Sequence, residues 1–285
     1  MNLRRLLFRL CGLALNALSV FAPSAAGHIA MRLFGRPYRR LYSEADRRLF
    51  AQARRSFRFQ SGQHTLQAYC WAPEGASEEA PAALLLHGWE SHSGRWDFLI
   101  PELIRAGYRV YAMDAPAHGL SDGRWVHMLM YAEAVRALIR QEGAMRVVIG
   151  HSFGGAAAVA AFADLPPSEH PYKMAIMGAF DRTTRVIGDF GRNLKLRRRV
   201  IEGLYREIQR LTGHPASHFS IARMAGALHT QGLVIHDRGD AIVPFEEGQA
   251  IAEAMRQVDF MPTEGFGHGL KHREIVRRIG DFVRE

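Results

Sequence analysis

Short apolar runs alternate with helical patterns along the chain from about Ser56 onward. The segments SFRFQ (56–60) and TLQAYCWA (65–72) alternate as half-exposed strands do, and the short SGQH connection predicts an antiparallel pair at a sheet edge. Six further apolar runs follow: AALLLHG, YRVYAMD, MRVVIG, YKMAIMGAF, GLVIHD and VDFMPT. Because helical patterns separate most of them, for example at 96–105 and 130–141, we predict an α/β fold. Its central sheet is expected to be mainly parallel, with helices on both faces.

The N-terminal segment has a different pattern. Its polar and glycine positions recur at spacings of three and four, which places them in one narrow stripe of a helix: Asn2, Arg5, Arg9, Gly12, Asn16 and Ser19. Pro23 interrupts the apolar run before it reaches the ~20 residues of a membrane span. We predict an amphipathic helix lying in the plane of a membrane surface. Two alternatives stay open: a cleaved signal peptide, with the small residues 24–26 as its site, and a helix packed against the body of the protein.

The formal net charge of +9 is concentrated in two segments. Residues 1–60 contain twelve arginines against Glu44 and Asp46, which leaves the other 225 residues with a net charge of −1. Residues 181–210 contain nine Lys/Arg against four Asp/Glu. Because the rest of the chain is acidic and no recognition motif accompanies the charge, we expect no nucleic-acid partner. We expect the positive charge to bring the N-terminal helix into peripheral contact with an anionic membrane.

Composition and cysteine content narrow the class of protein further. A composition of 48% hydrophobic and 23% charged residues is typical of a soluble globular protein of the size of an enzyme, and it excludes a disordered chain. Cys11 and Cys70 are the two cysteines, and neither stands in a CxxC arrangement, so no disulfide framework is predicted. We expect a cytoplasmic protein at the inner face of the membrane, with export by an N-terminal signal as the alternative.

A candidate nucleophile stands where the third of the six runs ends. In GHSFG (150–154), a predicted strand turns at once into an alanine-rich helix, and the small neighbours let the two elements pass closely. Such a corner exposes the hydroxyl of Ser152 and sets the Phe153 N–H at a helix start, where a developing oxyanion can be held. GxSxG alone is a weak signal, because an ordinary glycine-rich turn has the same letters. The strand before and the helix after it favour the nucleophile.

A serine nucleophile needs a base and an acid that orients the base, and later strand ends supply both. GLVIHD leads into Asp237 and Asp240, and VDFMPT leads into His268. The chain resembles the α/β-hydrolase fold superfamily, whose catalytic residues follow one another in the order Ser152, Asp240, His268. Two further motifs carry the resemblance, LLLHGW (84–89) and DAPAHGLSDG (114–123). The resemblance covers about four fifths of the chain. The resemblance implies that the Trp89 N–H completes the oxyanion hole and that no cofactor is needed.

Two residue assignments have competitors. In similar proteins the acid lies a few residues past the strand, just before a VP-type turn, so the resemblance favours Asp240 over Asp237, which is expected to hold the turn. His268, between two glycines, is favoured as the base over His272, which falls in the first turn of the last predicted helix. The pair at 268 and 272 lacks the pattern of a zinc site, so no metal is expected. Four further histidines are expected to hold loops around the pocket by hydrogen bonds: His87, His92, His118 and His151.

About fifty residues between the runs AIMGAF and GLVIHD have helical spacing and little strand character. Similarity to the superfamily implies that they form a helical cap, at about 181–228, over the nucleophile. The sequence thus predicts an N-terminal amphipathic segment (1–50) and an α/β-hydrolase domain (51–285) that carries this cap.

The predicted function is hydrolysis of a carboxylic ester or related acyl bond of a small molecule, through an acyl-enzyme. Ser152 attacks, His268 transfers protons, Asp240 orients His268, and the N–H groups of Trp89 and Phe153 hold the oxyanion. The alternatives are a peptidase, thioesterase or carbon–carbon bond hydrolase of the same fold, and a non-catalytic member that binds a ligand. The sequence leaves the oligomeric state open.

Overall fold

The computed structural model describes residues 3–285, and their side chains from Leu7 onward. Its backbone divides into two compact units. We call residues 1–36 and 182–220 the helical unit, and residues 37–181 and 221–285 the sheet unit. The helical unit combines the N-terminal segment with the two long helices of the predicted cap, and residues 37–50 fall in the sheet unit. A position of the cap over the nucleophile stays a prediction.

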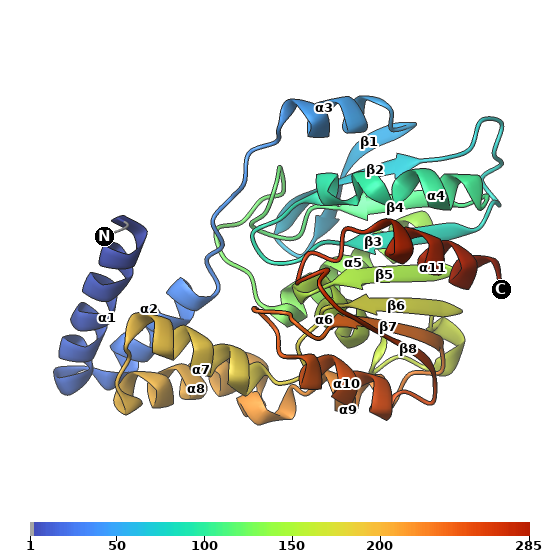
Figure 1. Cartoon of the computed structure of the whole chain (residues 1–285). Coiled ribbons are helices and arrows are strands. Elements are labelled where there is room, and N and C mark those ends of the chain that lie inside the picture. Colours follow the sequence, from blue (N-terminus) through green and yellow to red (C-terminus); the bar gives the residue numbers. More distant parts are fainter. Residues whose placement is uncertain (1–2) are drawn as a thin grey trace. The chain divides into compact units, whose positions relative to one another are not determined.

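The sheet unit is built on an eight-stranded sheet with the order β1-β2-β4-β3-β5-β6-β7-β8 (Figure 1). β2 runs antiparallel to both its neighbours, and the other pairs are parallel. The strands are β1 (Arg55–Ser61), β2 (His64–Trp71), β3 (Ala82–Leu86), β4 (Arg109–Met113), β5 (Val147–His151), β6 (Lys173–Met177), β7 (Gln231–Asp237) and β8 (Gln257–Thr263). Each predicted apolar run therefore forms a strand, and the mainly parallel sheet is confirmed.

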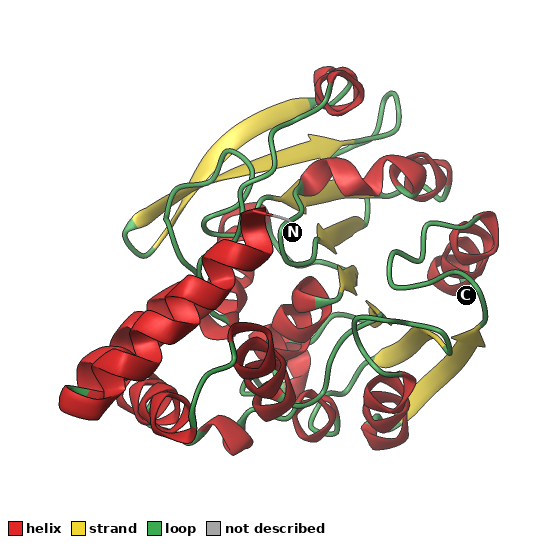
Figure 2. Cartoon of the chain, turned by 60° about the vertical axis from the view of Figure 1, so that its left-hand side comes forward, coloured by secondary structure: helices red, strands yellow, loops and turns green. Residues whose placement is uncertain are grey.

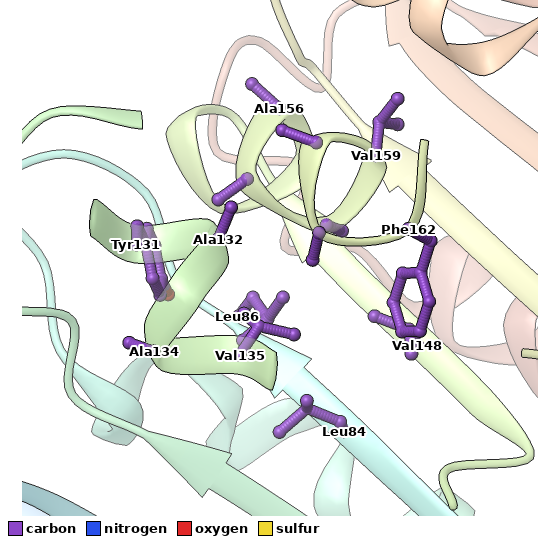
Figure 3. Packing of buried hydrophobic residues seen from close by; sticks show 14 of the residues in the cluster. Leu84, Leu86, Tyr131, Ala132, Ala134, Val135, Val148, Ala156, Val159 and Phe162 are labelled. Carbon is purple, nitrogen blue, oxygen red and sulfur yellow. The ribbon is translucent and has the colours of Figure 1, made fainter. Parts of the chain in front are cut away.

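Helices cover both faces of this sheet, which twists from one edge to the other (Figure 2). The helical elements of the sheet unit are α3 (Glu44–Ala51), η1 (Ser93–Phe98), α4 (Ile100–Arg105), α5 (Met128–Glu142), α6 (Phe153–Phe162), η2 (Pro167–Glu169), α9 (Ile221–Ala225), α10 (Phe245–Ala254) and α11 (Arg273–Arg284). Alternate strand residues enter two separate cores, because successive side chains of a strand point to opposite faces. Leu84, Leu86 and Val148 pack beneath α5 and α6 (Figure 3), whereas Leu85 and Ile149 pack against η1, α4 and α11.

Two local features differ from the predicted pattern. The helix expected at 96–105 is divided into η1 and α4 at Leu99, because Pro101 lacks an N–H and is confined to the first turn of a helix. The helix α3 was not predicted. The Ser43 side chain accepts from the Asp46 N–H, and the Asp46 carboxylate accepts from the Ser43 N–H. This capping box starts the helix and was visible in the sequence as Ser-x-x-Asp.

The helical unit contains α1 (Leu3–Phe21), α2 (Pro23–Phe34), α7 (Thr183–Leu194), α8 (Arg198–Thr212) and η3 (Ala216–His218). Pro23 ends the predicted N-terminal helix and opens α2, where a missing N–H is tolerated. α2 packs along α8 (Figure 1), with Gly27 and Gly203 so close that a Cβ on Gly27 would lie 2.4 Å from the Gly203 carbonyl carbon. Among residues 3–285, no helix is long and apolar enough to cross a bilayer.

Candidate active site

Ser152 lies at the sharp turn between β5 and α6, as predicted from the GHSFG pattern. Its φ of 52° and ψ of −118° place it in a region that side-chain-bearing residues rarely adopt. Glycines make the turn possible: a Cβ on Gly150 would lie 2.6 Å from the Gly154 carbonyl oxygen, and one on Gly154 would lie 2.3 Å from the Leu86 carbonyl oxygen. The turn is held in place because the Ser152 N–H donates to the Met177 carbonyl at 2.8 Å.

The structure brings together the three side chains that the sequence singled out from three strand ends. His268 Nε2 lies 3.1 Å from Ser152 Oγ, and His268 Nδ1 lies 2.7 Å from Asp240 Oδ2. The Asp240 carboxylate is fully buried, whereas 21% of the His268 side chain is exposed. With Nδ1 bonded to the carboxylate, Nε2 is free of a proton in the neutral ring and can accept one from the hydroxyl.

Asp240 is fixed as an ionised acceptor by several donors. Its Oδ1 accepts from the N–H groups of Ile242 and Val243 at 2.8 and 2.9 Å, which leaves Oδ2 toward His268. His236 Nε2 lies 3.4 Å from the same Oδ2. Burial alone would raise the pKa of Asp240, but hydrogen bonds from His236, His268 and the two backbone N–H groups together hold this pKa well below its ordinary value.

Asp237, the competing carboxylate, holds the loop after β8. It accepts hydrogen bonds from the Gly239 N–H at 3.0 Å, the Thr263 hydroxyl at 2.9 Å and the Phe266 N–H at 2.8 Å. These donors outweigh the effect of burial and lower its pKa. With its oxygens engaged by the loop that carries His268, Asp237 can position that loop, whereas Asp240 contacts the imidazole itself.

The two N–H groups predicted for an oxyanion hole belong to residues beside Ser152. A Cβ on Gly88 would lie 3.1 Å from Ser152 Cβ, so the HGW loop passes directly beside the serine. The Trp89 ring packs edge-on against the Phe153 ring, with centroids 5.4 Å apart. Phe153 is the first residue of α6, where backbone N–H groups have no partner within the helix.

Four buried or nearly buried histidines bond to the loops, as predicted. His87 Nδ1 donates to the Gly88 carbonyl, and its Nε2 accepts from the Ala115 N–H. His118 bridges Pro116 and Glu90 in the same way, His92 accepts from the Gly94 N–H, and His151 Nε2 donates to the His268 carbonyl at 2.7 Å. Burial lowers the pKa of His87, His118 and His151, so these three rings are neutral near pH 7. His272 caps α11 instead of reaching Ser152.

A buried network around Asp114 was missed at the sequence level, although DAPAHGLSDG begins with this residue. Asp114 accepts from the Ser93 N–H and hydroxyl, both at 2.8 Å, from the Leu120 N–H at 3.0 Å, and from the Tyr42 hydroxyl. Burial, followed by the neighbouring carboxylate, raises the pKa of Tyr42. The network joins the segments that follow β3 and β4. Nothing in the local pattern of Tyr42 marks it as their partner.

Within residues 3–285, no group of three or more His, Cys, Asp or Glu side chains is placed to hold a metal ion.

Known proteins resemble this chain in sequence and in fold. Residues 78–216, just under half of the chain, match the family described as Serine aminopeptidase, S33. An esterase of Pyrococcus furiosus superposes with a TM-score of 0.66 at 20% identity, over 87% of this chain and 98% of its own. The chain has the α/β-hydrolase fold, and its sequence is similar to members of that superfamily. The esterase RhEst1 from a Rhodococcus species shares the fold of this chain, with a TM-score of 0.61 and 18% identity, over 80% of this chain and 98% of its own.

Curated relatives of this chain include proteins named as esterases and lipases. A bifunctional esterase/perhydrolase of Acinetobacter calcoaceticus is 25% identical over an alignment of 253 positions, which covers 72% of this chain and 89% of the relative. A monoacylglycerol lipase of Mycolicibacterium smegmatis is 32% identical over 93 residues, so the match spans 30% of this chain and about a third of the lipase. The predicted fold is confirmed, the sequence matches agree with the predicted resemblance to the superfamily, and the relatives agree with the predicted class of enzyme, a hydrolase.

Proposed function

We propose that this protein is a serine hydrolase that cleaves a carboxylic ester through an acyl-enzyme intermediate. The observation that carries the proposal is the continuous chain of hydrogen bonds from Ser152 Oγ through the His268 ring to the buried Asp240 carboxylate. A serine hydroxyl becomes nucleophilic when an adjacent imidazole can take its proton, and the carboxylate stabilises the imidazolium that results. The esterases and lipases among the relatives support an ester as the substrate class.

In the proposed reaction, Ser152 Oγ attacks the carbonyl carbon and its proton passes to His268 Nε2. The N–H groups of Trp89 and Phe153 hold the negative oxygen of the tetrahedral intermediate. Collapse of the intermediate breaks the bond to the leaving alcohol, which receives the proton from His268. Water then attacks the acyl-enzyme with His268 as the base, releases the acid and restores the serine.

A fluorophosphonate probe and a short-chain p-nitrophenyl ester test the proposal on the full chain. The wild-type protein should be labelled at Ser152 and should hydrolyse the ester. The Ser152→Ala variant should lose both the labelling and the ester hydrolysis, while its far-ultraviolet circular dichroism spectrum is unchanged. Ester hydrolysis retained by Ser152→Ala, or labelling at another residue, would overturn the assignment.

A peptidase is the second candidate because the matching family is described by an aminopeptidase. Its reaction would use the same three side chains, with an amine as the leaving group. Parallel assays with matched p-nitrophenyl esters and aminoacyl p-nitroanilides separate the two. Hydrolysis of the anilides that Ser152→Ala abolishes would favour the peptidase, and hydrolysis of the esters without measurable cleavage of the anilides favours the esterase.

A further inference from the structure

The face of α1 that contacts protein is its polar side. Gly12, Leu15 and Ser19 are buried, and Asn16 is half-buried. Gly12 allows the helix to approach the end of α7 closely, since a Cβ there would lie 1.9 Å from the Leu194 carbonyl oxygen. The stripe of polar and small residues from Gly12 to Ser19 therefore packs against the protein.

Asn16 joins α1 to the turn between α7 and α8. Its amide Nδ2 donates to the Lys195 carbonyl at 2.9 Å, and its Oδ1 accepts from the Arg197 N–H at 2.7 Å. The basic run KLRRR (195–199) is thus held beside the middle of α1, and its four basic residues are exposed. A segment of exposed cationic residues is therefore attached to α1 through its backbone.

The opposite face of α1 is apolar and exposed. Phe21 is 89% exposed, Leu13 is 65% exposed, and Leu10 and Val20 are each about half exposed. Ala14 and Ala17 are exposed on the same face. A soluble helix normally turns such a face inward, and a contiguous exposed apolar surface marks a binding surface.

Charge decides which partner fits this surface. The helical unit contains fourteen Lys/Arg against three Asp/Glu, a net charge of +11, whereas the sheet unit has a net charge of −2. A second copy of the same face would bring two strongly cationic units together. In an anionic bilayer, by contrast, the leucines can be buried among the acyl chains while the arginines bind the phosphate groups.

We propose that the helical unit is a membrane-docking platform. α1 lies in the interface of an anionic phospholipid bilayer, with Leu10, Leu13, Ala17, Val20 and Phe21 inserted among the acyl chains. The basic run 195–199, which Asn16 holds beside α1 by hydrogen bonds, binds the anionic headgroups. The docking surface does not depend on the proposed ester hydrolysis, so each can be tested without the other.

The test is co-sedimentation of the full chain with phosphatidylcholine vesicles that contain or lack phosphatidylglycerol. We expect tight binding only when phosphatidylglycerol is present. The double variant Leu13→Gln/Phe21→Gln should bind about tenfold more weakly or worse, because burial of each side chain is lost. The matched control is Leu41→Gln in the sheet unit, which is 87% exposed and should bind as the wild type does.

A second variant tests the headgroup contact. Arg198→Gln/Arg199→Gln should reduce binding to the anionic vesicles by about fivefold per residue, and high salt should reduce wild-type binding in the same direction. All substituted side chains are exposed, so the fold is expected to persist, and ester hydrolysis on a soluble substrate should be unchanged. The Ser152→Ala protein should bind vesicles like the wild type.

Three outcomes would overturn the proposal. One is equal binding by Leu13→Gln/Phe21→Gln and the wild type, and another is equal binding to neutral and anionic vesicles. The third is a dimer in sedimentation velocity that Leu13→Gln/Phe21→Gln abolishes, without vesicle binding, which would make a second copy the occupant of this face.

Discussion

The central strands of the sheet unit and helix α1 of the helical unit place apolar residues differently. In β3 and β5, leucine, valine and isoleucine side chains are fully buried on both faces, and polar groups gather where strands end. In the helical unit, α1 buries Gly12, Leu15 and Ser19 against the protein, but it exposes other leucines, Val20 and Phe21. The comparison teaches that an apolar stripe in a sequence identifies a surface that avoids water, but it does not identify what covers that surface.

The largest expected effect concerns the chemistry of the sheet unit. Asp240→Asn should lower kcat on a soluble ester by about three to four orders of magnitude, because an amide cannot stabilise the imidazolium of His268. Asp237→Asn is the matched control. Since Asp237 contacts the loop and not the imidazole, its substitution should lower stability more than the rate of the folded enzyme.

Steady-state kinetics combined with urea unfolding measures both effects. A large kcat loss for Asp237→Asn with unchanged stability, and a small loss for Asp240→Asn, would reverse the two assignments. Neither variant should change vesicle binding, since the carboxylates belong to the sheet unit.

A matched set of glycine substitutions compares the packing of the two units. Gly154→Ala forces a Cβ to within 2.3 Å of the β3 backbone in the centre of the sheet, so we expect a loss of about 3 kcal/mol in the free energy of unfolding. Gly27→Ala meets the backbone of Gly203, where two helices can separate slightly, and should lose about 1 kcal/mol. Differential scanning calorimetry and urea titration report both losses.

Gly188→Ala in α7 is the control, because only the flexible Arg192 side chain lies near its added Cβ. It should stabilise the helical unit by about 0.5–1 kcal/mol through the higher helix propensity of alanine. If Gly154→Ala were as stable as the wild type, the close passage of α6 over β3 would be wrong.

One expected effect appears only as the pH is lowered, in the pH dependence of stability. Burial lowers the pKa of His118 to about 4, from an ordinary value of 6.5. As the pH falls between these values, the unfolded chain binds a proton that the folded chain does not, so folded stability decreases by about 1.4 kcal/mol per pH unit for this residue. In His118→Gln this contribution should be absent. The slope of the free energy of unfolding against pH should therefore be smaller by about 1.4 kcal/mol per pH unit, which corresponds to one proton fewer taken up on unfolding.

Urea unfolding across that pH range measures the slope, and His214→Gln, at an exposed position of the helical unit, is the matched control. Identical slopes for the His118→Gln variant and the wild type would show that His118 titrates alike in the folded and unfolded chains.

Much of this structure could be predicted because strong local patterns agree with the fold. Continuous apolar runs specified the strands, and the meeting of parallel strand ends at one edge brought Ser152, Asp240 and His268 within reach of each other. Long-range partners were not predictable. Tyr42 bonds to Asp114, and Asn16 bonds to the 195–197 turn, through contacts that leave no periodic trace in the sequence.

The bond between Asn16 and the Arg197 N–H has a consequence for the order of folding. Arg197 precedes the first turn of α8 and supplies no side-chain cap of its own, so the start of this helix takes its acceptor from a residue 181 positions earlier. During synthesis, α1 emerges from the ribosome long before the turn that will accept its polar flank. Through that interval the polar flank of α1 lacks its partners in α7 and α8. Under the membrane docking proposed above, the helix would therefore be able to reach a bilayer before synthesis of the protein is complete.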